Sequence, residues 1–199
     1  MPHITPDEAL SYLIEGNRKF LSEETVHQPL TGKMRLELAS GQQPFAAYVS
    51  CSDSRVPPEL LFGRGLGELF IVRNAGNTVD TAAMGSLEFA VDVLKVPLIV
   101  IMGHENCGAV SAAVSVVKDH TIYKGNIGQM IEPIIPAVIE AGTEDVNVAV
   151  RQNVRRIVHR LRTDSAPALL EPQERGELKV VGAYYSLKSG QVDFFDLPD

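Results

Sequence analysis

Three short apolar runs constrain the fold of this chain more than any other feature. They occupy residues 45–50, 69–72 and 97–102, and no charged residue interrupts them. Runs of this length suit strands that are buried on both faces, as in a parallel sheet. Residues 78–94 and 109–117 carry apolar residues at helical spacing, so strands and helices alternate as in βαβ units. We therefore expect an α/β fold with a mostly parallel central sheet flanked by helices.

The N-terminal residues 1–40 predict a helical arm. The sequence TPDE at residues 5–8 combines a capping threonine, a proline at the first helical position and a glutamate that completes a capping box. Four apolar residues then follow at helical spacing, Leu10, Leu13, Ile14 and Phe20. This apolar face needs a packing partner outside its own short segment.

The C-terminal half predicts a long helix and a hairpin. Residues 144–162 have helical spacing and a basic second half, which we interpret as a solvated helix face. The apolar stretches 178–187 and 192–197 flank the turn sequence KSGQ, which indicates a hairpin at an edge of the sheet. Because no linker or internal repeat divides the chain, we expect one domain over residues 1–199, with its α/β core at 45–199.

The charge balance argues against two classes of partner. A net charge of −7 and a pI near 5.3 do not suit nucleic acid or an anionic membrane as the main partner. No apolar stretch approaches the roughly 18 residues of a membrane span, and the first residues do not have the pattern of a secretory signal. We expect a cytoplasmic protein.

Polar residues with metal-binding chemistry stand where the apolar runs end. Cys51 follows the first run, Arg73 the second, and His104 comes shortly after the third. The carboxyl ends of parallel strands meet at one edge of a sheet, so Cys51 can join His104 and Cys107 there. Zinc accepts two cysteines and a histidine. Because the chain has only two cysteines, this set favours a catalytic zinc site with an open fourth position.

The same cysteines allow other interpretations. They could form a disulfide, which is unusual in a reducing cytosol. They could be small core residues, with His104 as an ordinary loop residue. The segment CSDSR at 51–55 could be a phosphatase-like loop with a cysteine nucleophile, although its arginine lies too close and the loop has no glycine.

Asp53 and Arg55 add a charged pair to the first of these strand ends. Asp53 lies two residues after Cys51, close enough to reach the open position of the metal or its water. Arg55 can pair with Asp53, which would lower the pKa of the carboxyl group and hold it in one orientation. Asp53 could also cap the following helix, and the two roles are compatible.

Three sequence blocks together resemble the signature of the β-class carbonic anhydrases. They are CSDSRVP at 51–57, RNAGN at 73–77 and GHENCGAV at 103–110, and the similarity extends over residues 5–195. The resemblance implies reversible hydration of carbon dioxide to bicarbonate and a proton by zinc-bound hydroxide, with one Zn²⁺ per chain. A related zinc hydrolase acting on carbonyl sulfide or carbon disulfide would keep the same ligands. A non-enzymatic module of this fold should lack a ligand or the charged pair, and this chain has all five residues.

The resemblance also assigns roles to individual residues. The metal ligands would be Cys51, His104 and Cys107, and the catalytic pair Asp53 and Arg55. The substrate pocket would contain Gln42, contributed by the partner subunit, and Phe70, Ala75, Phe89 and Gly108. The family forms homodimers and homotetramers with active sites at the subunit interface, and its N-terminal helices embrace the neighbouring subunit.

One departure from the family concerns an inhibitory bicarbonate pocket. Some members build this pocket from a tryptophan, an arginine and a tyrosine, and the matching residues here are Tyr48, Arg73 and Tyr185. With Tyr48 in place of the tryptophan, we expect Asp53 to pair with Arg55 near neutral pH and to leave the metal open. That pairing should be a contact of two hydrogen bonds.

Overall fold

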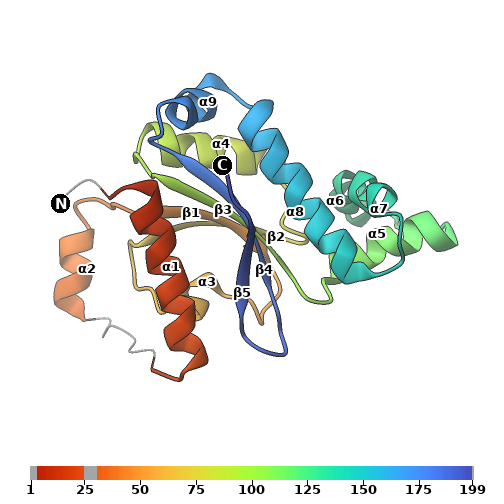
Figure 1. Ribbon diagram of the computed structural model, residues 1–199, viewed down its shortest axis with the longest axis horizontal. Coiled ribbons are helices and arrows are strands. Elements are labelled where there is room, and N and C mark those ends of the chain that lie inside the picture. The colour runs from red at the N-terminus through yellow and green to blue at the C-terminus, as the bar shows by residue number, and fades with distance from the viewer. Residues whose placement is uncertain (1–3, 25–30, 199) are drawn as a thin grey trace.

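The computed structural model describes residues 4–24 and 31–198. Its centre is a five-stranded sheet in the order β2-β1-β3-β4-β5, shown in Figure 1. The strands are β1 (Ala46–Cys51), β2 (Leu69–Asn74), β3 (Leu98–His104), β4 (Lys179–Tyr185) and β5 (Val192–Asp196). The first four are parallel and β5 runs antiparallel to β4. The predicted mostly parallel sheet with a C-terminal edge hairpin is confirmed.

Helices surround this sheet. They are α1 (Pro6–Leu21), α2 (Gly32–Leu38), α3 (Pro58–Leu61), α4 (Thr81–Asp92), α5 (Gly108–Asp119), α6 (Asn126–Ile131), the 3₁₀ helix η1 (Glu132–Ile134), α7 (Ile135–Ala141), α8 (Val146–Thr163) and α9 (Pro167–Glu174). Within the described residues, no helix is long and apolar enough to cross a membrane.

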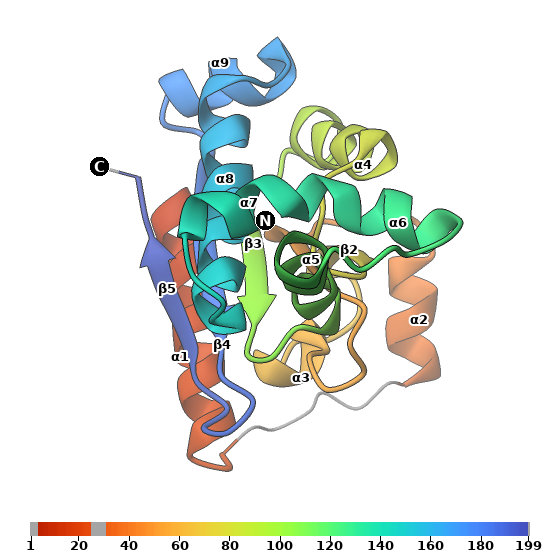
Figure 2. The same ribbon diagram turned by 90° about the vertical axis from the view of Figure 1, so that its right-hand side faces the viewer.

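The apolar runs form the core because they lie in the middle of the sheet. Every residue of β1 and β3 is buried, as expected for strands covered on both faces. Residues of α1 and α3 belong to the core on one face, and residues of α4, α8 and α9 to the core on the other. Figure 2 shows α7 and α6 in a row that passes above α5.

Helix α8 approaches the sheet closely because glycines lie beneath it. A Cβ atom at Gly103 of β3 would lie 2.4 Å from Cγ1 of Val150. A Cβ at Gly182 of β4 would lie 2.9 Å from Cγ1 of Val154. The absence of both side chains lets α8 pack directly over β3 and β4 and carries its side chains to the loops that follow the strands.

The basic half of α8 is only partly a solvated face. Arg151 lies 4.2 Å from the ring centre of Tyr184 and forms an ion pair of 2.8 Å with Asp193. Arg162 donates to the carbonyl of Val180 and pairs with Asp196. The interpretation as a solvated face therefore does not hold for these two arginines, which fasten the C-terminal hairpin to α8.

Helix α1 begins as predicted but packs within its own chain. Its capping box is formed by Thr5 and Glu8. Of the predicted apolar face, Leu13 is fully buried, and Leu10 and Phe20 pack against the same core, whereas Ile14 is 49% exposed. The expectation that this face packs outside its own short segment is therefore confirmed, and the embrace of a neighbouring subunit stays a prediction.

A buried asparagine fixes α1 to the rest of the fold. The side-chain amide of Asn17 donates to the carbonyl of Gly190 at 3.0 Å, and its oxygen accepts from the backbone N–H of Val192 at 2.8 Å. The amide also donates to the carbonyl of Leu61 at 3.4 Å. One side chain thus joins α1, the end of α3 and the hairpin, which lie together in Figure 1.

Candidate metal centre and active site

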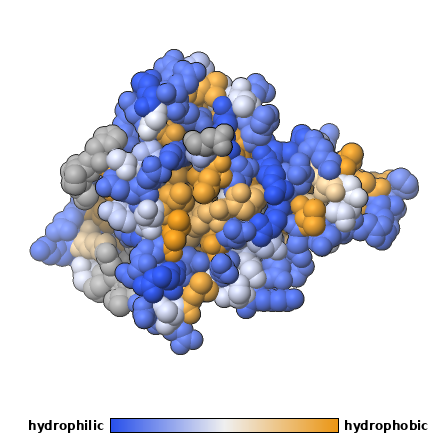
Figure 3. Space-filling model, in the orientation of Figure 1, coloured by the Kyte–Doolittle hydropathy of each residue, from blue (hydrophilic) through white to orange (hydrophobic). Residues whose placement is uncertain are grey.

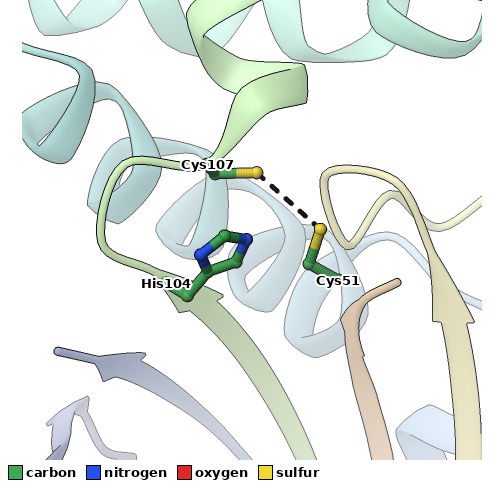
Figure 4. A group of neighbouring side chains, drawn as sticks. All are labelled: Cys51, His104 and Cys107. Carbon is green, nitrogen blue, oxygen red and sulfur yellow. Dashed lines mark hydrogen bonds between the residues drawn. The ribbon is translucent and has the colours of Figure 1, made fainter. Parts of the chain in front are cut away.

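Three side chains from separate elements converge at the carboxyl edge of the sheet. Cys51 ends β1, His104 ends β3, and Cys107 caps α5. Their ligand atoms lie within 4.8 Å of one another and all three residues are buried. Figure 4 shows them pointing toward a common centre. Both cysteines are free, which excludes a disulfide in this structure.

The geometry of this group fits a tetrahedral zinc ion. Two sulfurs about 2.3 Å from zinc at a tetrahedral angle would lie about 3.8 Å apart, and the observed distance between the Sγ atoms is 3.9 Å. Nε2 of His104 is buried and has no hydrogen-bond partner among the described residues. A buried polar atom normally has a partner. We therefore interpret Nε2 of His104 as a ligand of the metal.

The backbone sets the orientation of His104. Its Nδ1 lies 3.0 Å from the carbonyl oxygen of Glu105, an acceptor only, so Nδ1 carries the proton and donates. The lone pair of Nε2 is then directed at the two sulfurs. A histidine that binds metal is usually held through its other nitrogen in this way.

The two thiols influence each other's ionisation in the metal-free protein. A hydrogen bond from Cys107 lowers the pKa of Cys51 to about 4. The same contact, together with burial, raises the pKa of Cys107, which must ionise beside an existing thiolate. Zinc needs both sulfurs as thiolates, so its binding must remove the proton that Cys107 retains.

Asp53 is held beside this centre by Arg55. The two oxygens of Asp53 accept hydrogen bonds of 2.9 and 2.8 Å from Nε and one terminal nitrogen of Arg55, so the expected two-bond contact is present. These bonds hold the pKa of Asp53 well below its usual range. Oδ2 of Asp53 lies 4.0 Å from Nε2 of His104, which places an ionised carboxylate at the edge of the metal position.

Two of the three residues matched to a bicarbonate pocket are engaged in structural contacts. Tyr48 is fully buried, and its hydroxyl donates to the sulfur of Met102. Arg73 donates to the backbone carbonyls of Cys51 and Asp53 at 3.0 and 2.6 Å. Within the described chain no hydrogen bond joins any two of Tyr48, Arg73 and Tyr185. The bicarbonate pocket stays a prediction, with Tyr48 and Arg73 already engaged elsewhere.

The residues assigned to the substrate pocket lie at an open surface. The rings of Phe70 and Phe89 are 6.3 Å apart, and Phe89 is 46% exposed. A Cβ at Gly108 would meet no atom within 4 Å. Ala75 is half-buried, and Gln42 is exposed. Their contact with a substrate stays a prediction.

Comparison with known proteins identifies the family. A sequence model described as carbonic anhydrase matches residues 46–192. The chain is 39% identical over 194 residues to carbonic anhydrase 2 of Mycobacterium tuberculosis, covering 96% of this chain and 93% of that protein. It superimposes on the β-carbonic anhydrase of Coccomyxa with a TM-score of 0.71 and 30% identity, covering 94% and 86% of the two chains. The chain belongs to the β-class carbonic anhydrases.

Other members of this class extend the match. The carbonic anhydrase of Mycolicibacterium smegmatis is 37% identical over 196 residues, covering 97% of this chain and 95% of that one. A β-carbonic anhydrase of Sordaria macrospora shares the fold with a TM-score of 0.75 at 24% identity, covering 94% and 96%. The predicted family and fold class are confirmed.

The sequence analysis missed the residues that brace the metal-binding loops of this β-carbonic anhydrase. The carboxylate of Glu105 accepts from Ser186 and from the backbone N–H of Lys188, both at 3.1 Å. Asn147 of α8 accepts at 2.9 Å from the backbone N–H of Asn106, which has a left-handed φ of 53°. Glu105 gave no signal because a glutamate beside a ligand has many roles. Asn106 did give one, since asparagine tolerates this backbone conformation.

Proposed function

We propose that this protein catalyses the reversible hydration of carbon dioxide to bicarbonate and a proton at one zinc ion per chain. The observation that carries the proposal is the buried group of Cys51, His104 and Cys107, whose histidine nitrogen has no other partner in the described chain. Three protein ligands leave one position for water or substrate, as in catalytic zinc sites. The negatively charged carboxylate of Asp53 lies beside that position and can orient a reacting group there.

Each residue near the metal has a definable task. Zinc, when bound, lowers the pKa of a coordinated water and so supplies a nucleophile near neutral pH. The two thiolates offset the charge of the metal, so we expect activity to rise with pH. Because Arg55 keeps the pKa of Asp53 low, Asp53 is a poor proton acceptor and acts by accepting a hydrogen bond. Arg55 positions Asp53.

Carbon dioxide is apolar and requires an apolar site. Phe70, Ala75 and Phe89 would supply it, and Gly108 would leave space beside Cys107. Phe70 and Phe89 are the best supported, because their rings lie together and Phe89 is 46% exposed. A large exposed aromatic residue suits a binding surface that another molecule or a second subunit completes.

We also propose a homodimer or homotetramer in which each active site is completed by a neighbour. Strand β2 lies at one edge of the sheet and β5 at the other, and an edge strand offers backbone groups for pairing. Helix α2 has no buried residue, and Leu36 within it is 77% exposed. Figure 3 shows apolar residues gathered between α1 and α8, where β5 lies in Figure 1. Gln42 follows α2 and would reach the neighbouring site.

The decisive experiment measures zinc content and carbon dioxide hydration on the same purified samples. The wild type should contain about one zinc per chain and hydrate carbon dioxide. His104→Asn should lose both properties, and His159→Asn, which alters an exposed histidine of α8, should lose neither. Full zinc retention by Cys107→Ser would contradict the ligand assignment. Hydrolysis of carbonyl sulfide without carbon dioxide hydration would replace the proposed substrate.

A further inference from the structure

Asn153 is a polar residue on the buried face of α8. It is 2% exposed and lies between Val150 and Val154, both of which belong to the core. An amide in such a place is costly unless it forms a hydrogen bond. Its Nδ2 donates to the carbonyl oxygen of Gly76 at 3.2 Å, so this side chain reaches from α8 to the loop after β2.

Gly76 connects this contact to the metal centre. Its backbone N–H donates to Sγ of Cys51 at 3.4 Å, so the residue gives its carbonyl to α8 and its N–H to a metal ligand. Its φ of +79° suits glycine, and a Cβ there would lie 2.6 Å from Cδ1 of Ile134. Fixing the carbonyl of Gly76 therefore restrains the dihedral angles that aim its N–H at the sulfur.

We propose that Asn153 is a positioning residue that tunes how strongly Cys51 donates charge to zinc. It holds Gly76 so that the N–H of Gly76 keeps its hydrogen bond to Sγ of Cys51. A hydrogen bond withdraws electron density from a thiolate, and two thiolates otherwise offset the whole charge of the ion. Partners of this kind typically change metal affinity by about 10–100-fold. The inference rests on the proposed function because it requires Cys51 to be a zinc ligand.

The competing explanation is that the loop after β2 braces itself. Nδ2 of Asn74 donates to the carbonyl of Thr78 at 2.7 Å, and the backbone N–H of Ser52 donates to the carbonyl of Asn74 at 2.9 Å. If these bonds alone fix the loop, Asn153 only fills space in the core. A test must therefore measure how Cys51 binds the metal as well as the stability of the fold.

The test compares Asn153→Leu and Asn153→Ala with the wild type. Leucine has the branching of asparagine without its donor, and alanine removes the side chain beyond Cβ. Gln152→Ala is the matched control, because Gln152 is an amide on the same helix whose bond goes to Glu140 at 3.0 Å. Thermal unfolding identifies variants that fold. Chelator competition then gives the zinc dissociation constant, and the cobalt-substituted protein gives the energy of the sulfur-to-cobalt charge-transfer band.

We expect both Asn153 variants to bind zinc about tenfold more weakly, because a released Gly76 no longer holds the sulfur of Cys51 in its ligand position, and to shift the charge-transfer band, with Gln152→Ala unchanged. Wild-type affinity and an unshifted band in a folded variant would overturn the inference. If neither variant folds, ¹¹³Cd-substituted wild type decides. Scalar couplings across both hydrogen bonds, from Nδ2 of Asn153 to the carbonyl of Gly76 and from the amide proton of Gly76 to cadmium through Cys51, would support the inference. The absence of either coupling would overturn it. A wild type that binds no zinc would instead refute the proposed function itself.

Discussion

Cys51 and Cys107 share one strongly held proton before metal binds. The hydrogen bond from Cys107 lowers the pKa of Cys51, so this sulfur is the one of the two that ionises first. The pKa of Cys107 is raised by the same contact, so this thiol keeps its proton. Because zinc requires both thiolates, lowering the pH favours the metal-free form and raising the pH favours the loaded form.

This arrangement predicts the number of protons that zinc displaces. At pH 7, binding should release about one proton per zinc, and affinity should rise about tenfold per pH unit. Calorimetric titration in two buffers with different ionisation enthalpies measures this number directly. Release of about two protons would show that Cys51 is also protonated in the metal-free protein.

Arg55→Ala should impair catalysis without removing the metal. The variant loses the two side-chain bonds that orient Asp53 and frees this carboxylate to turn toward the metal position. Misplacing a group in an active site can lower kcat/KM about 10²-fold, whereas zinc content should stay near one per chain. Arg18→Ala, which breaks an arginine–glutamate pair on the surface of α1, is the control. A loss below threefold in Arg55→Ala would show that Asp53 needs no such restraint.

At the scale of elements, one buried polar side chain joins α1 to two other parts of the fold. Asn17 binds backbone groups of Leu61, Gly190 and Val192, and Asn17→Ala leaves all three without their side-chain partner. We expect a loss of about 2–3 kcal/mol in the free energy of unfolding. Ser11→Ala on the exposed side of α1 should change it by less than about 0.5 kcal/mol. Urea unfolding of the two zinc-loaded variants, at one fixed protein concentration, compares their free energies of unfolding. Equal losses would contradict a special role for Asn17.

Strands and helices could be predicted from the sequence where burial alone decides which residues they contain. The apolar runs at 45–50 and 97–102 form fully buried central strands. A strand that is covered on both faces has no solvent-facing positions, so its sequence shows no polar alternation and can be recognised. Side-chain contacts between distant elements were harder to foresee. Asn153 interrupts the apolar face of α8, which signals a buried polar contact, but no local pattern names Gly76 as its partner. The interpretation of the basic half of α8 as a solvated face missed the roles of Arg151 and Arg162, because the hairpin that they bind follows only later in the chain.

At the scale of the whole molecule, the metal ligands lie within one chain, whereas our proposal places Gln42 in the site of a neighbour. Gln42 is exposed and makes no hydrogen bond to the metal-binding residues of its own chain within the described structure. If Gln42 acts in the active site of a neighbouring subunit, full activity requires the protein to form an oligomer. A fully active monomer in sedimentation with a parallel assay would contradict it.

Mixed assemblies provide a sharper test of the shared site. Gln42→Ala keeps its metal ligands but cannot supply the glutamine, and Cys107→Ser lacks a ligand but keeps Gln42. Dissociating and reassociating the two variants together should produce sites with intact ligands and a donated glutamine. Activity should then exceed the sum of the separately treated variants. Simple addition of the two activities would show that Gln42 does not act across the interface.

Two of the three ligands end strands that meet only in the finished sheet, and the third begins α5, so the site is assembled from segments synthesised at different times. Cys51 leaves the ribosome long before His104, and β3 also pairs with β4 near the end of the chain. Asn147, which holds the loop between His104 and Cys107, emerges later than either ligand. We therefore expect a nascent chain without α8 and β4 to hold the three ligands less firmly than the finished fold does. Zinc should accordingly bind most tightly to a chain that has already folded.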